Sequence, residues 1–222
     1  LLNKKDDFVD RIFNDRVFSS YQSALSKPEL AKKIFVGGYP SVQSSSETSR
    51  YDWFSSYITL ILEKDIKDLS RISDVTNFPN LIHILAARAG NILNVADISR
   101  KSGFAITTLH RYIGLLVTLF IIDMQKAWSA NLANRFIHSP KVYMVDSGLL
   151  SFFLDATPEK IVNNPYLMGG ILENFVVGEI QKQLTWNKTR ASMYHMRTKS
   201  GVEVDIVLED AAGNIVGIEV KN

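Results

Sequence analysis

The stretch Gly201-Val-Glu-Val-Asp-Ile-Val-Leu208, followed by a polar link and Ile215-Val-Gly-Ile-Glu-Val-Lys221, decides how the end of this chain folds. Both arms alternate apolar and polar residues, as half-buried strands do. The link 209–214 is short and rich in turn formers, so the arms are predicted to form a β-hairpin. Glu219 and Lys221 then share one face of their strand, and Asp205 can reach it from the neighbouring strand. Such a group of two carboxylates and an ammonium could hold a divalent cation beside a phosphate.

The composition excludes several classes of protein. The 222 residues are 46% hydrophobic, which suffices for a sizeable core and for more than one domain. Because the net charge is only +2, any contact with nucleic acid must come from a local patch. The absence of cysteine excludes disulfides and thiolate chemistry, and it fits a cytoplasmic location. The apolar run 115–122 is far shorter than a membrane span, so no membrane partner is expected.

The middle of the chain is predicted to form a winged helix-turn-helix. Helical segments are expected at 79–89, 95–102 and 105–119, with Gly103 in the tight turn before the last, and β-like runs follow at 120–124 and 142–145. The last helix would present Thr107, Thr108 and Arg111 on its polar side, where such residues could contact a DNA groove. Winged helices also serve as protein-docking modules, and duplex-binding helices usually carry more than one basic side chain.

The chain as a whole is predicted to be α+β, with three parts. A helical region covers 1–75, including an amphipathic helix from 51 to 69, and a winged-helix-like domain covers 76–150. A loop at 155–168 would hold the boundary to an α/β domain at 160–222, which is expected to be truncated at its end. In that domain, Gly169-Gly170 would open a helix running to 184, ahead of a strand at 193–197 and the hairpin.

The order of helix, strand, strand with Asp, and strand with Glu-x-Lys resembles the restriction-endonuclease-like fold. The resemblance implies that Asp205 and Glu219 hold Mg²⁺ and that Lys221 orients or polarises the water or the phosphate. It also implies a further acid from the preceding helix, and Glu173 is preferred to Glu179, which points to nearly the opposite side. Nearby basic residues, Arg197 and Lys199, are predicted to contact DNA. The family often has proline directly before the aspartate, where this chain has Val204.

A wider resemblance covers roughly residues 30–222. Six short segments in order are similar to the C-terminal region that follows an AAA-type ATPase module in many bacterial and archaeal proteins. They are Gly37-Gly-Tyr-Pro40, Trp53-Phe-Ser-Ser-Tyr57 with Glu63-Lys-Asp-Ile66, Leu93-Asn-Val-Ala-Asp-Ile98, Ser139-Pro-Lys-Val-Tyr143 with Asp146-Ser-Gly-Leu149, Gly170-Ile-Leu-Glu-Asn-Phe-Val176, and the final hairpin. The family usually has arginine where Lys64 stands.

This resemblance implies an ATPase module ahead of Leu1. By position alone, residues 1–35 would be the tail of the lid of that module. ATP would bind only there, because no glycine in this chain is followed by the lysine of a phosphate-binding loop. The leading hypothesis is therefore a DNA-binding fragment of a larger ATPase with a nuclease-like, Mg²⁺-dependent site. The competing hypothesis is a non-catalytic module that keeps the nuclease fold as a scaffold and docks a partner protein or a second copy of the chain.

Overall fold

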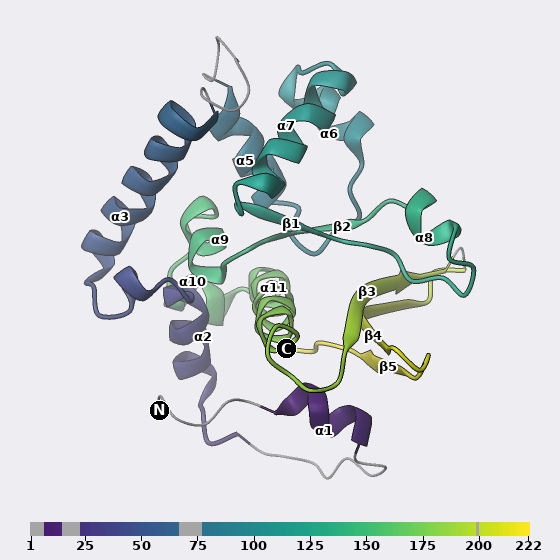
Figure 1. Cartoon of the computed structure of the whole chain (residues 1–222). Coiled ribbons are helices and arrows are strands. Elements are labelled where there is room, and N and C mark those ends of the chain that lie inside the picture. The colour runs from purple at the N-terminus through teal and green to yellow at the C-terminus, as the bar shows by residue number, and fades with distance from the viewer. Residues whose placement is uncertain (1–6, 15–22, 67–76, 199) are drawn as a thin grey trace.

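The computed structural model describes residues 7–14, 23–66, 77–198 and 200–222 of the chain (Figure 1). These residues form an α+β protein, mostly helical in its first part, with two small antiparallel sheets later. The first part contains α1 (Phe8–Asn14), α2 (Lys27–Val36), the short 3-10 helix η1 (Pro40–Val42), α3 (Glu47–Leu60), the π-helix η2 (Ile61–Ile66), α5 (Phe78–Ala86), α6 (Val95–Ser102) and α7 (Ile106–Thr118). The remainder contains β1 (Ile122–Gln125), α8 (Asn134–Ile137), β2 (Lys141–Met144), α9 (Ser147–Phe153), α10 (Pro158–Asn163), α11 (Pro165–Gln183), β3 (Ala191–Arg197), β4 (Glu203–Asp210) and β5 (Ile215–Ile218).

The helix predicted from 51 to 69 is shorter and begins earlier. The Ser46 hydroxyl accepts a hydrogen bond from the backbone N–H of Ser49, which starts α3 one turn before the first residue of the apolar pattern. After Leu60 the backbone widens into η2, and residues 67–69 lie outside the described part of the chain. The polar segment 41–49 therefore contains most of η1 and the first turn of α3.

The helices and strands predicted between 79 and 145 are present. The Asn94 side chain caps α6 by accepting from the Asp97 N–H, and Gly103 ends α6 in the left-handed region at φ +77°. After α7, β1 pairs antiparallel with β2, with Ile122 opposite Met144. The connection between the two strands packs against the second sheet, because the backbone of His195 in β3 bonds to Lys126 and Trp128.

The expectation of a loop at 155–168 is wrong. The Thr157 hydroxyl caps α10, and the Asn164 side chain caps α11 by accepting from the Leu167 N–H. Each cap is followed by a proline at the first helical position, where its missing N–H costs nothing. Residues that resemble a loop in sequence are thus two helix starts, and α11 begins at Pro165 rather than at the double glycine.

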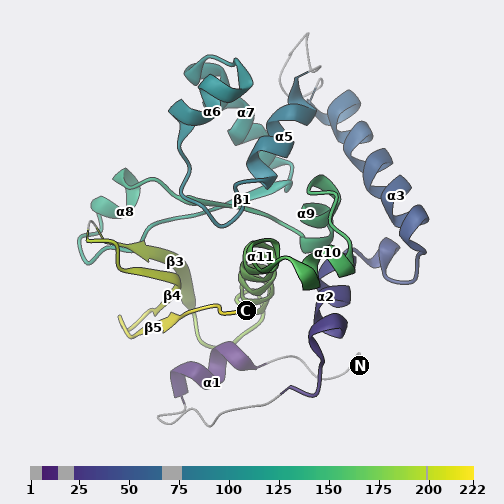
Figure 2. The same ribbon diagram turned by 180° about the vertical axis from the view of Figure 1, so that it is seen from behind.

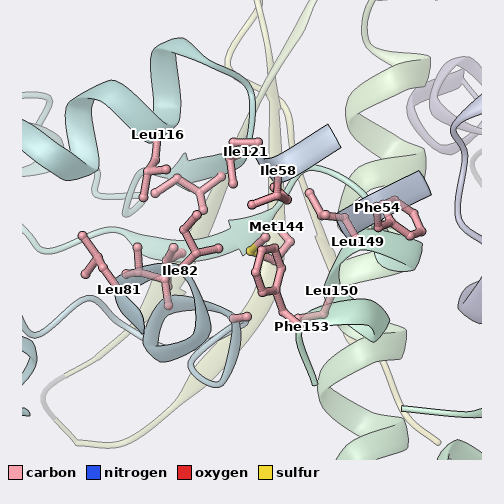
Figure 3. Packing of buried hydrophobic residues seen from close by; sticks show 14 of the residues in the cluster. Phe54, Ile58, Leu81, Ile82, Leu116, Ile121, Met144, Leu149, Leu150 and Phe153 are labelled. Carbon is pink, nitrogen blue, oxygen red and sulfur yellow. The ribbon is translucent and has the colours of Figure 1, made fainter. Parts of the chain in front are cut away.

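The predicted hairpin is present as β4 and β5, with Ile206 opposite Ile218, and β3 completes a three-stranded antiparallel sheet. Figures 1 and 2 show α11 at the centre of the molecule, with this sheet on one side and α2, α9 and α10 on the other. The larger core joins α2, α3, α5, α7, α9, α11 and β2, and Figure 3 shows part of it, from Phe54 and Ile58 to Leu149 and Phe153. A smaller core joins α1, α11 and β4 through Val9, Val177, Ile180, Ile206 and Leu208. Because α11 contributes to both cores, it fixes the sheet relative to the helical part.

Candidate functional site

A buried lysine lies at the centre of three carboxylates. The Nζ atom of Lys141 is 2.9 Å from an oxygen of Glu173, 2.9 Å from one of Glu203 and 3.5 Å from one of Asp205. The Lys141 side chain is only 2% exposed, whereas those of Glu173, Glu203 and Asp205 are 18%, 35% and 15% exposed. We refer to these four residues, with Tyr143, as the Lys141 cluster. A buried cation with several oxygen partners is compensated inside the protein rather than by solvent.

Strand periodicity brings the cluster together. Lys141 and Tyr143 are two residues apart in β2, so both side chains leave the same face of that strand. Glu203 and Asp205 share a face of β4 in the same way, and Glu173 comes from α11. The cluster therefore joins β2, α11 and β4, three elements that are distant in sequence.

Glu173 has two further neighbours that fix its carboxylate. The Tyr143 hydroxyl donates a 2.6 Å hydrogen bond to Glu173 Oε1, the oxygen that also contacts Lys141. On the other side, Gly90 has φ +79°, and a Cβ atom there would lie 3.2 Å from Glu173 Oε2. A side chain at position 90 would therefore be both strained and crowded, and glycine allows the backbone to approach the acid.

The cluster shifts the ionisation of the groups around it. Burial acts to lower the pKa of Lys141, but the contacts with Glu203 and Glu173 outweigh it and leave the pKa raised. Burial and the negative charge of Glu173 raise the pKa of the Tyr143 hydroxyl. Burial, together with the charge of Lys141, lowers the pKa of the nearby His195 to about 4. At neutral pH, Lys141 is thus charged, whereas Tyr143 and His195 are neutral.

The structure brings only some of the predicted catalytic residues into this cluster. Asp205 and Glu173 are members, which places the acid chosen from α11 beside the aspartate of the hairpin. Glu219 and Lys221 follow the end of β5 and pair with each other at 2.7 Å, with side chains 42% and 79% exposed. The same segment reaches Asp205 through its backbone, since the Val220 N–H donates to Asp205 Oδ2 at 3.0 Å.

The acids as arranged do not fit a divalent cation. One oxygen of Asp205 accepts from Val220 and the other faces Lys141, whose ammonium takes the place among the carboxylates where a cation would lie. No group of three His, Asp or Glu residues in the described part of the chain is placed to hold a metal ion. Mg²⁺ held by Asp205 and Glu219 therefore stays a prediction.

The predicted DNA contacts fall on two surfaces. Thr107 and Arg111 are exposed on α7, and Thr108 is half-buried beside them. Arg197 ends β3 with a half-exposed side chain whose guanidinium is 3.8 Å from Glu203. Lys199 lies outside the described residues.

Sequence reasoning missed Lys141 and Glu203 as members of the site. Both have a signal that could have found them: Glu203 stands two residues before Asp205 in an alternating strand, and Lys141 stands two before Tyr143. The Lys141 segment takes part in the family resemblance, but no local pattern connects its charge to the hairpin, because 64 residues separate Lys141 from Asp205.

Asp146 acts as the helix cap that its position before Ser-Gly predicts. Its two oxygens accept from the N–H groups of Leu149 and Gly38, at 2.9 and 2.6 Å. Burial raises its pKa, although both N–H groups act against that shift. At Gly37, which has φ +77°, a Cβ would lie 2.3 Å from Asp146 Oδ1, so the double glycine packs directly on this cap. The segments Gly37–Pro40 and Asp146–Leu149 therefore form one structural contact.

The fold and the cluster define an α+β protein in which a helical region and a small sheet are joined by a buried ion network. The chain belongs to the family described as Domain of unknown function (DUF8612), whose model matches residues 27–160. The model of a second family, Domain of unknown function (DUF4143), matches residues 168–222. Lys141 lies in the first matched region and its three acids lie in the second.

Two mycobacterial proteins are similar to most of the chain. Uncharacterized protein Rv2008c of Mycobacterium tuberculosis and Uncharacterized protein Mb2031c of Mycobacterium bovis are each 28% identical over 182 residues, which is 82% of this chain. The chain spans 40% of the length of these relatives. No solved structure matches the chain significantly. Within the described ranges, every helix falls short of the length or apolarity that a bilayer crossing needs.

Proposed function

We propose that this chain binds duplex DNA through α7 as part of a larger ATPase. The observation that carries the proposal is the surface formed by α7 and the end of α6. Thr107, His110 and Arg111 are exposed on α7, and the side chains of Arg100 and Lys101 on α6 are 71% and 60% exposed. Polar and basic side chains on the second helix of such a pair are suited to contact a groove and its phosphates.

The proposed link to an ATPase rests on the family and on length. Regions of the DUF4143 kind commonly follow AAA-type ATPase domains, and this chain covers only two fifths of its mycobacterial relatives. ATP would then act through a module outside this sequence, since the sequence has no phosphate-binding loop. The part described here would supply the contact with DNA.

In this proposal the Lys141 cluster has a structural role. Its lysine comes from the region that carries α7, and its acids come from α11 and β4. The connection from β1 to β2 is also held on the second sheet, by the backbone bonds to His195 and by the ion pair of Arg135 with Glu209. The DNA-binding surface would therefore be held rigidly on the rest of the chain.

A salt titration tests the proposal. A labelled duplex of about 20 base pairs should bind with an affinity that falls steeply with salt, because each phosphate contact releases counterions. Arg111→Gln should reduce the slope of log Kd against log salt by about 1 if its guanidinium contacts a phosphate. Thr107→Ala should weaken binding without changing that slope. Lys32→Gln is the control, because it removes an exposed charge on the distant helix α2. It should change neither the affinity for DNA nor its dependence on salt.

Protein docking is the second candidate, and two exposed apolar residues favour it. Ile106 at the start of α7 is 49% exposed, and Phe120 just after α7 is 74% exposed. Exposed apolar side chains at the two ends of a helix can take part in a surface that meets another protein or a second copy of the chain. If no duplex binds even at about 20 mM salt, and Phe120→Ser converts an oligomer to a monomer in light scattering, docking replaces DNA binding as the function of this surface.

A further inference from the structure

A second part of the molecule has the features of a ligand site and shares no residue with the Lys141 cluster. A cavity of about 260 Å³ lies between α2, α3 and α9 and the segment that follows α9. Its lining includes Arg50, Tyr51 and Phe54 of α3, Phe35 of α2 and Phe152 of α9. Phe54 stands three residues after Tyr51 and four after Arg50, the spacings that place side chains on one helical face.

The cavity contains a buried guanidinium, that of Arg50, which forms no ion pair with any described residue. Arg50 is only 7% exposed. One of its terminal nitrogens donates to the Ser45 carbonyl at 3.0 Å, and its Cζ lies 5.1 Å from the centre of the Phe35 ring. Its Nε is buried without a hydrogen-bond partner, and no carboxylate of the described residues forms an ion pair with it. Because arginine keeps its charge, burying it unpaired is unfavourable unless an anion joins it.

The rest of the cavity wall is aromatic. The ring of Phe152 lies 5.0 Å from that of Tyr51 and 5.7 Å from that of Phe54, between centroids. Side chains of this kind hold the apolar body of a ligand, while a few polar groups fix its orientation. The volume lies just below the range of about 300–1,000 Å³ that is usual for ligand pockets, so only a compact ligand would fit.

The acidic residues at the cavity limit the charge of the ligand. Glu47 and Asp155 also line it, and both are exposed. Two carboxylates in the cavity wall would repel a polyphosphate, whereas a ligand with a single negative charge could be bound by Arg50. The chemistry thus favours one anionic group on a compact apolar body.

We infer that this cavity is a binding site for a small organic monoanion with an apolar or aromatic body, such as an arylalkyl carboxylate. The carboxylate would pair with the Arg50 guanidinium, which is built for two parallel hydrogen bonds to such a group. The body would lie against Phe35, Tyr51 and Phe152. The inference is independent of the proposed DNA binding, since it rests on none of the residues of α6 or α7.

Calorimetry with 3-phenylpropionate, benzoate and hexanoate on the 222-residue chain tests it. At least one of these acids should bind saturably below about 10 mM, and its neutral amide should bind at least tenfold more weakly. Arg50→Gln should weaken the acid at least about tenfold, and Arg50→Lys should bind it with an intermediate affinity because it keeps the charge but loses the planar fork. Arg100→Gln removes the same charge from an exposed position and should have no effect.

A second variant tests the cavity without touching the charge. Ala156 lines the cavity and is 5% exposed, so Ala156→Leu should fill it and abolish binding while Arg50 remains. Thermal melting of each variant shows whether it is folded. The inference is overturned if none of the three acids binds, if acid and amide bind equally, or if a folded Arg50→Gln chain binds like the unaltered one.

Discussion

Two of the buried cations among the described residues, Lys141 and Arg50, are compensated in opposite ways. Lys141 has three carboxylates within 3.5 Å, drawn from α11 and β4. Arg50 has a backbone carbonyl and an aromatic ring, but no carboxylate among the described residues. Because a buried charge needs a partner, the first cation is satisfied within the protein, and the second is suited to a partner from outside. Burial alone therefore does not distinguish a structural ion pair from a ligand site. The presence or absence of carboxylates in contact with the cation does.

Removing the compensated cation should have the largest effect. In Lys141→Met, the carboxylates of Glu173, Glu203 and Asp205 would face one another without a positive charge. We expect the free energy of unfolding to fall by roughly 3–5 kcal/mol, as when one partner of a buried ion pair is lost. Urea denaturation of the variant measures this change.

Two further variants separate charge from packing at this position. Lys221→Met, at the exposed end of the hairpin, should leave the denaturation midpoint unchanged. Adding Glu173→Gln to Lys141→Met should restore part of the loss, because it removes one of the repelling charges. If Lys141→Met were as stable as the unaltered chain, the cluster would not hold the two matched regions together.

Acid should weaken the fold through His195. Its pKa is lowered to about 4 in the folded chain, so between about pH 6.5 and 4 the unfolded state binds a proton that the folded state does not. The free energy of unfolding should therefore fall as the pH is lowered through this window, by up to about 3 kcal/mol. His195→Gln removes this contribution, so its stability should depend less on pH over the same range. Identical pH profiles for the two chains would contradict the assignment to His195.

These expectations depend on contacts of which only some can be predicted from the sequence. Helices and strands with local signals were predictable: Asn94 and Gly103 delimit α6, and the alternation around Asp205 gives the hairpin. The start of α11 was not, because Asn164-Pro165 has the same composition as a loop and only the cap geometry shows its role. In the site, the pairing of Glu173 with Asp205 followed from a resemblance. The position of Lys141 between these acids could not be predicted, because it depends on how β2 packs against α11 and β4, and no local pattern encodes that packing.

A metal titration tests whether the ammonium of Lys141 takes the place of a metal ion among its three carboxylates. If the ammonium of Lys141 occupies the place of a cation, Lys141→Met should bind Mn²⁺ about tenfold more tightly than the unaltered chain, as three carboxylates become available. Electron paramagnetic resonance of free Mn²⁺ measures both affinities, and Asp205→Asn added to the variant should reverse the gain. Tight binding by the unaltered chain that depends on Glu219 would instead support the predicted pair of Asp205 and Glu219.

The smallest effect is expected at the uncompensated cation. Arg50→Met loses the bond to Ser45 and the contact with Phe35, but it also removes the cost of an unpaired buried charge. These changes oppose each other, so without ligand the free energy of unfolding should change by less than about 1 kcal/mol. Urea denaturation of Arg50→Met and Lys141→Met in parallel compares the two losses of stability directly, since both variants replace a buried cation by the same apolar side chain. A loss at Arg50 as large as that at Lys141 would mean that its charge is already compensated within the fold, and the distinction between the two cations would fail.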